Sequence, residues 1–72
     1  MTTQMFPVQS SQISYIGFEE ETNILYVTFS NNTTWVYYSV SKEVFEALKN
    51  ATSVGKYFNS EIKGKYDMNK IK

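Results

Sequence analysis

Hydrophobic and polar positions alternate with a period of two along the first half of the chain, which predicts strands. In one segment Leu25, Val27 and Phe29 alternate with a less apolar set of side chains, so we expect these three to face the core. The polar stretches between such segments contain Asn, which tolerates the backbone of tight turns. The expected strands are residues 10–18, 23–29 and 33–40.

The period changes to that of a helix after residue 40. Val44, Phe45 and Leu48 share one helical face, and Val54, Phe58 and Ile62 share a second one. Ser41 and Ser53 are suitable N-caps for the two helices, and Gly64 is suited to end the second. The predicted fold class is therefore α+β: a three-stranded antiparallel β-meander followed by two short α-helices packed on one face of the sheet. Residues 1–66 are predicted to form a single domain, and residues 67–72 a frayed C-terminal tail.

The third expected strand carries more aromatic residues than one small core requires. Trp35 and Tyr37 would share one face of it, and Val36 and Tyr38 the other. Only one of these faces belongs to the core that Leu25 and its neighbours form. Two interpretations of Trp35 and Tyr37 stay open: they pack, or at least one of them lines a surface for a ligand or partner.

Composition excludes several kinds of chemistry. The 72 residues contain no Cys and no His, so the chain has no disulfide, no thiolate metal site and no imidazole base. A Ser–Lys pair using Lys56 or Lys63 is the remaining route to a nucleophile, and helix capping is the simpler role for the serines. We expect no enzymatic activity, no metal and no cofactor. Aromatic residues, at 17% of the chain, are expected to stabilise the small core instead.

Charge is distributed unevenly although the net charge is zero. Residues 1–48 contain one Lys and five Glu, whereas residues 49–72 contain six Lys, one Glu and one Asp. Such asymmetry indicates either an anionic partner or pairing between the two halves. The first residues have neither a basic segment nor a long apolar one, and no apolar run approaches a membrane span. We therefore expect a cytoplasmic protein that does not bind a membrane.

The order of these segments resembles the KTSC domain family, which is named for its occurrence at the C-terminus of some lysyl-tRNA synthetases. The resemblance covers about residues 8–66, and its most specific part is the run "ATSVGKYFN". Other matching segments are "SSQISYIGF", "LYVTF", "WVY" and "IKGKY". The chain departs from the family pattern at three positions: Trp35 stands in place of a Tyr, Ser41 in place of a Pro and Lys63 in place of an Arg.

The resemblance implies a small α+β domain, and the attachment to a tRNA synthetase suggests RNA binding. Bases stack on aromatic side chains, and lysines attract phosphate. We therefore predict a non-enzymatic module that binds RNA or a nucleotide. The candidate residues are Trp35, Tyr37, Lys56, Tyr57, Lys63, Lys65 and Tyr66.

An alternative function is that of a phage-type interaction protein that inhibits a host protein or sequesters a host signalling ligand. Aromatic anchors are also what protein interfaces use. The unpaired edges of a small open sheet additionally predict a homo-oligomer.

Overall fold

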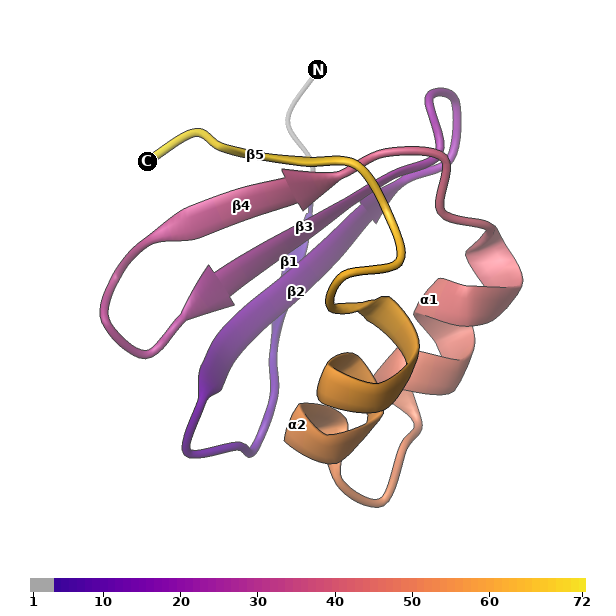
Figure 1. Cartoon of the computed structure of the whole chain (residues 1–72). Helices are drawn as coiled ribbons and strands as arrows, with labels where there is room; N and C mark the ends of the chain where they lie inside the picture. Colours follow the sequence, from indigo (N-terminus) through magenta and orange to yellow (C-terminus); the bar gives the residue numbers. More distant parts are fainter. Residues whose placement is uncertain (1–3) are drawn as a thin grey trace.

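A five-stranded antiparallel sheet, covered on one face by two helices, forms the protein (Figure 1). The structure is a computed structural model and describes residues 4–72. The strands follow one another in the sheet in the order of the sequence. They are β1 (Met5–Pro7), β2 (Ile13–Glu19), β3 (Ile24–Phe29), β4 (Thr34–Tyr37) and β5 (Met68–Lys70). The helices are α1 (Lys42–Lys49) and α2 (Val54–Tyr57), and α2 continues directly into a π-helical turn, η1 (Phe58–Ile62).

The sequence-based prediction of three strands is wrong by two, although the α+β class and the two helices on one face are confirmed. The missed strands are β1 and β5, the two edges of the sheet. Each has three residues, which is too short for a period of two to be recognised. β5 lies in the segment 67–72, for which we predicted a frayed tail. Hydrogen bonds hold this segment on β4: Tyr38 N donates to Asp67 O (2.9 Å) and Thr34 N to Lys72 O (3.1 Å).

Local signals placed both helices correctly. Ser41 Oγ accepts a hydrogen bond from Val44 N (3.2 Å), and Ser53 Oγ accepts one from Lys56 N (3.4 Å), so both predicted N-caps are confirmed. Gly64 follows the π-helical turn with a φ of 78°, a backbone conformation that glycine adopts without strain.

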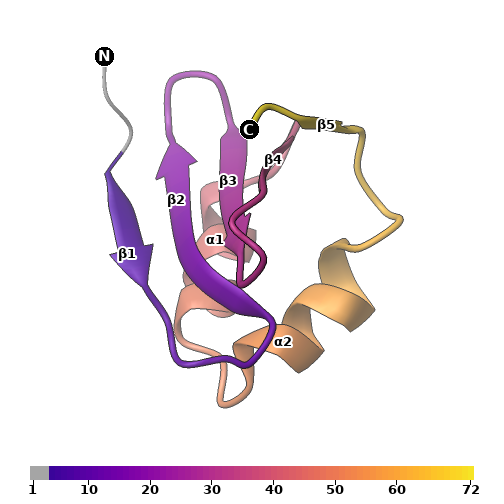
Figure 2. The ribbon, with the colours of Figure 1, turned by 90° about the vertical axis from the view of Figure 1, so that its left-hand side faces the viewer.

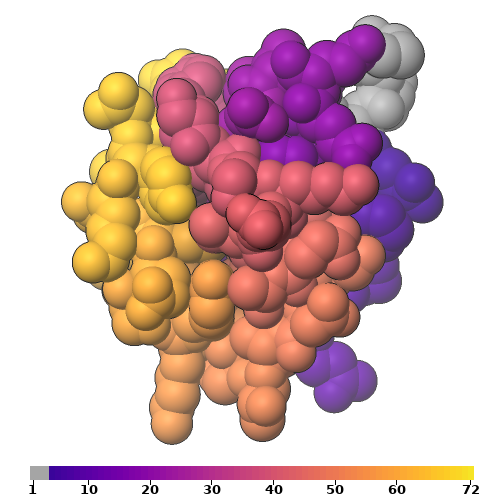
Figure 3. Space-filling model, turned by 90° about the vertical axis from the view of Figure 1, so that its right-hand side faces the viewer, coloured from indigo at the N-terminus to yellow at the C-terminus, as the bar shows by residue number. Residues whose placement is uncertain are grey.

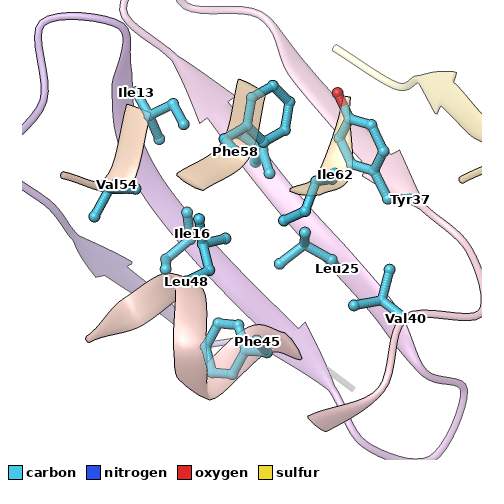
Figure 4. Close-up of a cluster of buried hydrophobic side chains, with 11 residues drawn as sticks. Ile13, Ile16, Leu25, Tyr37, Val40, Phe45, Leu48, Val54, Phe58 and Ile62 are labelled. Atoms are coloured by element: carbon cyan, nitrogen blue, oxygen red, sulfur yellow. The ribbon is translucent and has the colours of Figure 1, made fainter. Parts of the chain in front are cut away.

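The core lies between the helices and the sheet face that carries Leu25 and Val27. Phe45 and Leu48 of α1 and Phe58 of η1 pack on this face, as Figure 4 shows. In the space-filling view from the helix side, residues of the two helices cover the centre and the lower part of the surface, and the C-terminal segment lies beside them (Figure 3). β4 turns Trp35 and Tyr37 toward this core, because Tyr37 pairs with Leu25 and Trp35 with Val27 in neighbouring strands. The question of which β4 face joins the core is thereby answered.

An irregularity in β2 brings two isoleucines three positions apart into the same core. The pairing register with β3 shifts between Ile13 and Tyr15, which is the signature of a β-bulge. Ile13 and Ile16 are both fully buried as a result, whereas Tyr15 points to the other face and is 46% exposed.

The opposite face of the sheet has no helix on it (Figure 2). One row across this face consists of Gly17, Tyr26, Val36 and Asn69, which pair in succession from β2 to β5. Val36 is buried although it is not part of the core cluster under the helices. Homo-oligomerisation through this face or through a sheet edge stays a prediction.

Candidate functional site

A cavity of about 400 Å³ opens on the helix-covered side of the sheet, next to the turn between β3 and β4. We call it the Trp35 cavity. Strands, turns, η1 and the end of the chain all contribute to its wall. Its lining residues are Gln12, Phe29, Ser30, Asn31, Thr33, Trp35, Tyr37, Phe58, Lys63 and Met68. A volume of this size lies in the range of ordinary small-molecule sites.

Aromatic rings form the apolar wall of the Trp35 cavity. The ring of Phe58 meets Phe29 edge to face, with centroids 5.4 Å apart, and meets Tyr37 in the same way at 5.5 Å. These contacts fix three of the rings, since edge-to-face pairs have a preferred geometry. Tyr37 and Phe58 belong to the core, whereas Trp35 is only half-buried. Trp35 is therefore both a packing residue and part of an accessible wall.

The polar rim is held by its own hydrogen bonds. Asn31 Oδ1 accepts from Thr33 N (3.2 Å) and from Thr33 Oγ1 (2.6 Å), which fixes the β3–β4 turn. Ser30 N donates to Gln12 O (2.9 Å) and ties that turn to the loop before β2. Asn32 adopts a φ of 68°, the positive value expected of Asn in a tight turn. The rim is thus formed before any ligand arrives.

An amide pair connects the rim to the helix layer. Gln12 Nε2 donates to Asn59 Oδ1 (3.2 Å), and Asn59 Nδ2 donates to Gln12 Oε1 (3.3 Å). A Cβ at Gly55 would lie 3.2 Å from Ser10 Oγ and 3.4 Å from Gln12 Oε1, so α2 approaches this loop closely. Ser10 Oγ in turn accepts from the backbone N–H groups of Gln12 and Ile13. In the motif "ATSVGKYFN", Gly55 and Asn59 therefore hold the wall of the cavity in place.

The seven candidate residues from the sequence do not form one site. Trp35, Tyr37 and Lys63 line the Trp35 cavity. Lys65 and Tyr66 line a separate hollow of about 340 Å³, together with Tyr38, Ser39, Gly64 and Asp67. Lys56 and Tyr57 line neither hollow.

The side chains of Lys56 and Tyr57 differ in environment. Lys56 is exposed on α2, and Tyr57 is half-buried against the core. The two residues are neighbours in sequence, and neighbours on a helix point in different directions.

Sequence reasoning also missed most of the cavity wall. Gln12 and Thr33 lie in segments that were expected only as strands, Asn31 lies in the expected turn between two strands, and Met68 lies in the expected tail. The available signal was the turn after residue 29, which directly precedes the aromatic strand. Binding residues often lie on such turns beside a rigid sheet.

Charge at the Trp35 cavity is positive. Lys63 is the cation of its lining, and no carboxylate occurs among the described residues that line it. The ion pairs found within residues 4–72 join Lys42 to Glu20 (2.7 Å) and Lys49 to Glu46 (3.9 Å). Neither ion pair uses a lysine beyond residue 49. Of the basic segment 49–72, Lys49 pairs with a carboxylate of the acidic half, whereas the lysines beyond residue 49 take part in neither of these ion pairs.

Burial affects one titratable group in the wall. Desolvation raises the pKa of the Tyr37 phenol above its ordinary value of 10.0, so this side chain is neutral at physiological pH. Its hydroxyl adds a polar atom to an otherwise apolar wall.

Other chemistry finds little support in the described part of the chain. No group of three or more His, Cys, Asp or Glu residues within residues 4–72 is arranged to hold a metal ion. Ser10 Oγ and Ser53 Oγ accept hydrogen bonds from backbone N–H groups. No helix in residues 4–72 is long and apolar enough to cross a membrane.

Comparisons with known proteins identify relatives of two sizes. The family profile of the KTSC domain matches residues 9–66. A protein of Tsukamurella paurometabola is 37% identical over 62 residues, which cover 86% of this chain and 92% of that protein. A lysine–tRNA ligase of Nostoc punctiforme is 33% identical over 63 residues, which cover 88% of this chain and only 11% of the ligase.

A solved structure extends the likeness to three dimensions. The crystal structure of a KTSC domain protein from Yersinia pestis matches with a TM-score of 0.95 and 32% sequence identity. The match covers 99% of this chain and 100% of that one, so the two chains share the arrangement over nearly their whole length.

Proposed function

The chain belongs to the KTSC domain family, and from this premise we propose that it is a binding module without catalytic activity. Its ligand is a nucleobase held in the Trp35 cavity, either of a free nucleotide or of an unpaired position in RNA. The observation that carries the proposal is the wall itself: Trp35, Phe29 and Tyr37 surround a space with one lysine and no carboxylate among the described lining residues.

Stacking supplies the main attraction in this proposal. A base on an aromatic side chain is worth about 1–3 kcal/mol, and every base has a face suited to it. Trp35 is the suitable partner, because its half-buried ring is held by the sheet and still reachable from solvent. Gln12, Asn31 and Thr33 place amide and hydroxyl groups at the rim, where they would meet the polar edge of a base.

Electrostatics supports an anionic ligand over a neutral one. Lys56, Lys63, Lys65, Lys70 and Lys72 take part in neither of the ion pairs found in residues 4–72. Unneutralised lysines attract phosphate, and binding that depends on them weakens as salt concentration rises. The proposal also draws on the names of some relatives, which are lysine–tRNA ligases and so act on a nucleic acid.

Trp35 also provides the test, since it is the only Trp in the chain. We expect adenosine monophosphate and single-stranded oligoadenylate to change its fluorescence saturably, and less so at high salt. The substitution Trp35→Leu should raise the dissociation constant, measured by calorimetry, about tenfold or more. The matched control is Tyr15→Ser, which removes an exposed ring from the opposite face and should leave affinity unchanged.

Two results would contradict the proposal. One is the absence of a saturable change with either ligand at millimolar concentration. The other is equal affinity of the Trp35→Leu and wild-type proteins. Recovery of one stoichiometric protein from nuclease-treated bacterial lysate, without nucleotide binding, would favour the alternative of a protein that acts on a host protein.

A further inference from the structure

β5 lies outside the segment that matches the family profile, yet it completes the Trp35 cavity. The matched segment ends at residue 66, and β5 comprises Met68–Lys70. Met68 lines the cavity and is 51% exposed. The cavity of this chain is therefore built in part by residues that follow the segment matched by the family profile.

The register of β5 places a second cation beside Trp35. Lys70 is the direct cross-strand partner of Trp35, so both side chains stand on the same face of the sheet. Tyr38 N donates to Asp67 O, and Ile71 N donates to Thr34 O, so the pairs Tyr38–Asp67 and Thr34–Ile71 are hydrogen-bonded. Hydrogen-bonded and non-hydrogen-bonded pairs alternate along an antiparallel ladder. Trp35 and Lys70 therefore form a non-hydrogen-bonded pair, the kind in which side chains lie closest in an antiparallel sheet.

The position of Lys70 is fixed although its side chain is exposed. The hydrogen bond from Ile71 N to Thr34 O (2.9 Å) joins that from Tyr38 N to Asp67 O, so the backbone is held on both sides of Lys70. Lys63 lines the Trp35 cavity from the other layer, immediately after η1, where its N–H closes the π-helical turn by donating to Phe58 O (2.9 Å). Lys70 is not among the lining residues and stands beside the cavity as the cross-strand neighbour of Trp35. Two lysines from different layers thus flank the Trp35 wall, and neither belongs to an ion pair found in residues 4–72.

We propose that the ligand of the Trp35 cavity carries a phosphate next to its base, and that Lys63 and Lys70 bind this phosphate. β5 is then the element that makes the site prefer a nucleotide over a nucleoside. This inference rests on the proposed function and adds the substituent that the site selects. The ammonium group of a lysine acts as a point charge. Two such groups can bind one phosphate without the planar, bidentate geometry that an arginine would require.

The test compares adenosine with adenosine monophosphate by calorimetry at low salt. We expect the wild-type protein to bind the monophosphate about tenfold more tightly than the nucleoside. Lys70→Gln should weaken monophosphate binding about three- to tenfold and leave adenosine binding unchanged. Lys70→Arg should restore the preference, because the charge is kept.

Lys56→Gln is the matched control, since it removes the same charge from an exposed position on α2 that neither lines the cavity nor pairs with Trp35. An equal loss in Lys56→Gln and Lys70→Gln would show a general charge effect and overturn the inference. Equal wild-type affinity for the two ligands would overturn the inference and leave the proposed function standing. Failure of both ligands to bind would overturn both.

A further arm separates the two sources of the phosphate. Tighter binding of oligoadenylate than of the monophosphate, with the same loss on Lys70→Gln, indicates an unpaired base in RNA. Tighter binding of the monophosphate indicates a free nucleotide. Thermal unfolding of each variant verifies that the fold is retained.

Discussion

Two aromatic clusters at opposite ends of the helix layer use similar side chains and leave different surfaces. At the α1 end, Phe45 stacks on Phe18 with centroids 5.3 Å apart and contacts Phe6 at 6.4 Å. Lys49 lies over this cluster, with Nζ 4.9 Å from the ring centroid of Phe6. At the η1 end, the rings around Phe58 meet edge to face and leave the Trp35 cavity beside them.

The difference lies in what covers the rings. The hollow at the α1 end, of about 300 Å³, is lined by two lysines and two glutamates, and its lysines form ion pairs with those glutamates. The charged side chains at that end are therefore paired within the chain. Among its described lining residues, the Trp35 cavity has one lysine and no carboxylate. The cation–π contacts found in residues 4–72 involve Phe6 and Phe45, and none involves an aromatic ring of this cavity. Similar composition thus yields a cluster covered by ion-paired side chains at one end and an open cavity at the other.

The largest expected effect tests whether the two aromatic clusters contribute equally to the stability of the core. Phe45 and Phe58 are 5% and 2% exposed. Phe45→Ala and Phe58→Ala should each lower the free energy of unfolding by about 3–5 kcal/mol, because each leaves a buried cavity. Urea denaturation followed by Trp35 fluorescence measures the loss.

A domain of this size has little stability to lose, so Phe45→Leu and Phe58→Leu serve as milder variants. A loss at Phe58 far below that at Phe45 would contradict the view that the cavity end is as firmly packed as the α1 end.

A smaller effect on the free energy of unfolding distinguishes Lys49 at the α1 end from Lys63 at the cavity end. Lys49→Gln should lower the free energy of unfolding by about 0.5–1 kcal/mol, since it removes the cation over Phe6 and Phe45 and the contact with Glu46. Lys63→Gln should change it by less than about 0.5 kcal/mol, because Lys63 is exposed and belongs to neither ion pair found in the described chain.

Parallel urea denaturation at low and high salt measures this difference, and the loss at Lys49 should shrink with salt. Equal losses at the two positions would mean that the cation at the α1 end does not distinguish the clusters.

The smallest effect is confined to alkaline pH and to the cavity end. Burial raises the pKa of Tyr37 in the folded state above the ordinary value of 10.0, whereas the aromatic residues of the other cluster are phenylalanines. The folded state therefore keeps a proton that the unfolded state releases. This contribution to stability is complete below pH 10 and is lost as pH rises through the folded-state pKa.

Unfolding free energies of the wild type and Tyr37→Phe, measured from neutral to alkaline pH, test this point. The wild type should lose stability more steeply above pH 10 than the variant does. Parallel curves would mean that the Tyr37 phenol is not desolvated.

The sequence by itself determined the features that depend on near neighbours in the chain. Ser41 and Ser53 cap the helices because each side chain bonds an N–H three residues away. Leu25 and Val27 are core residues because a period of two selects one face.

Only the tertiary structure decided the features that need distant partners. β1 and β5 are strands because neighbouring edges offer backbone groups to them, and three residues carry no period that reveals this. The Trp35 cavity exists because positions as far apart as Gln12, Phe58 and Met68 meet around one ring. The face of Trp35 was fixed by its pairing with Val27, since alternation defines two faces without saying which is covered.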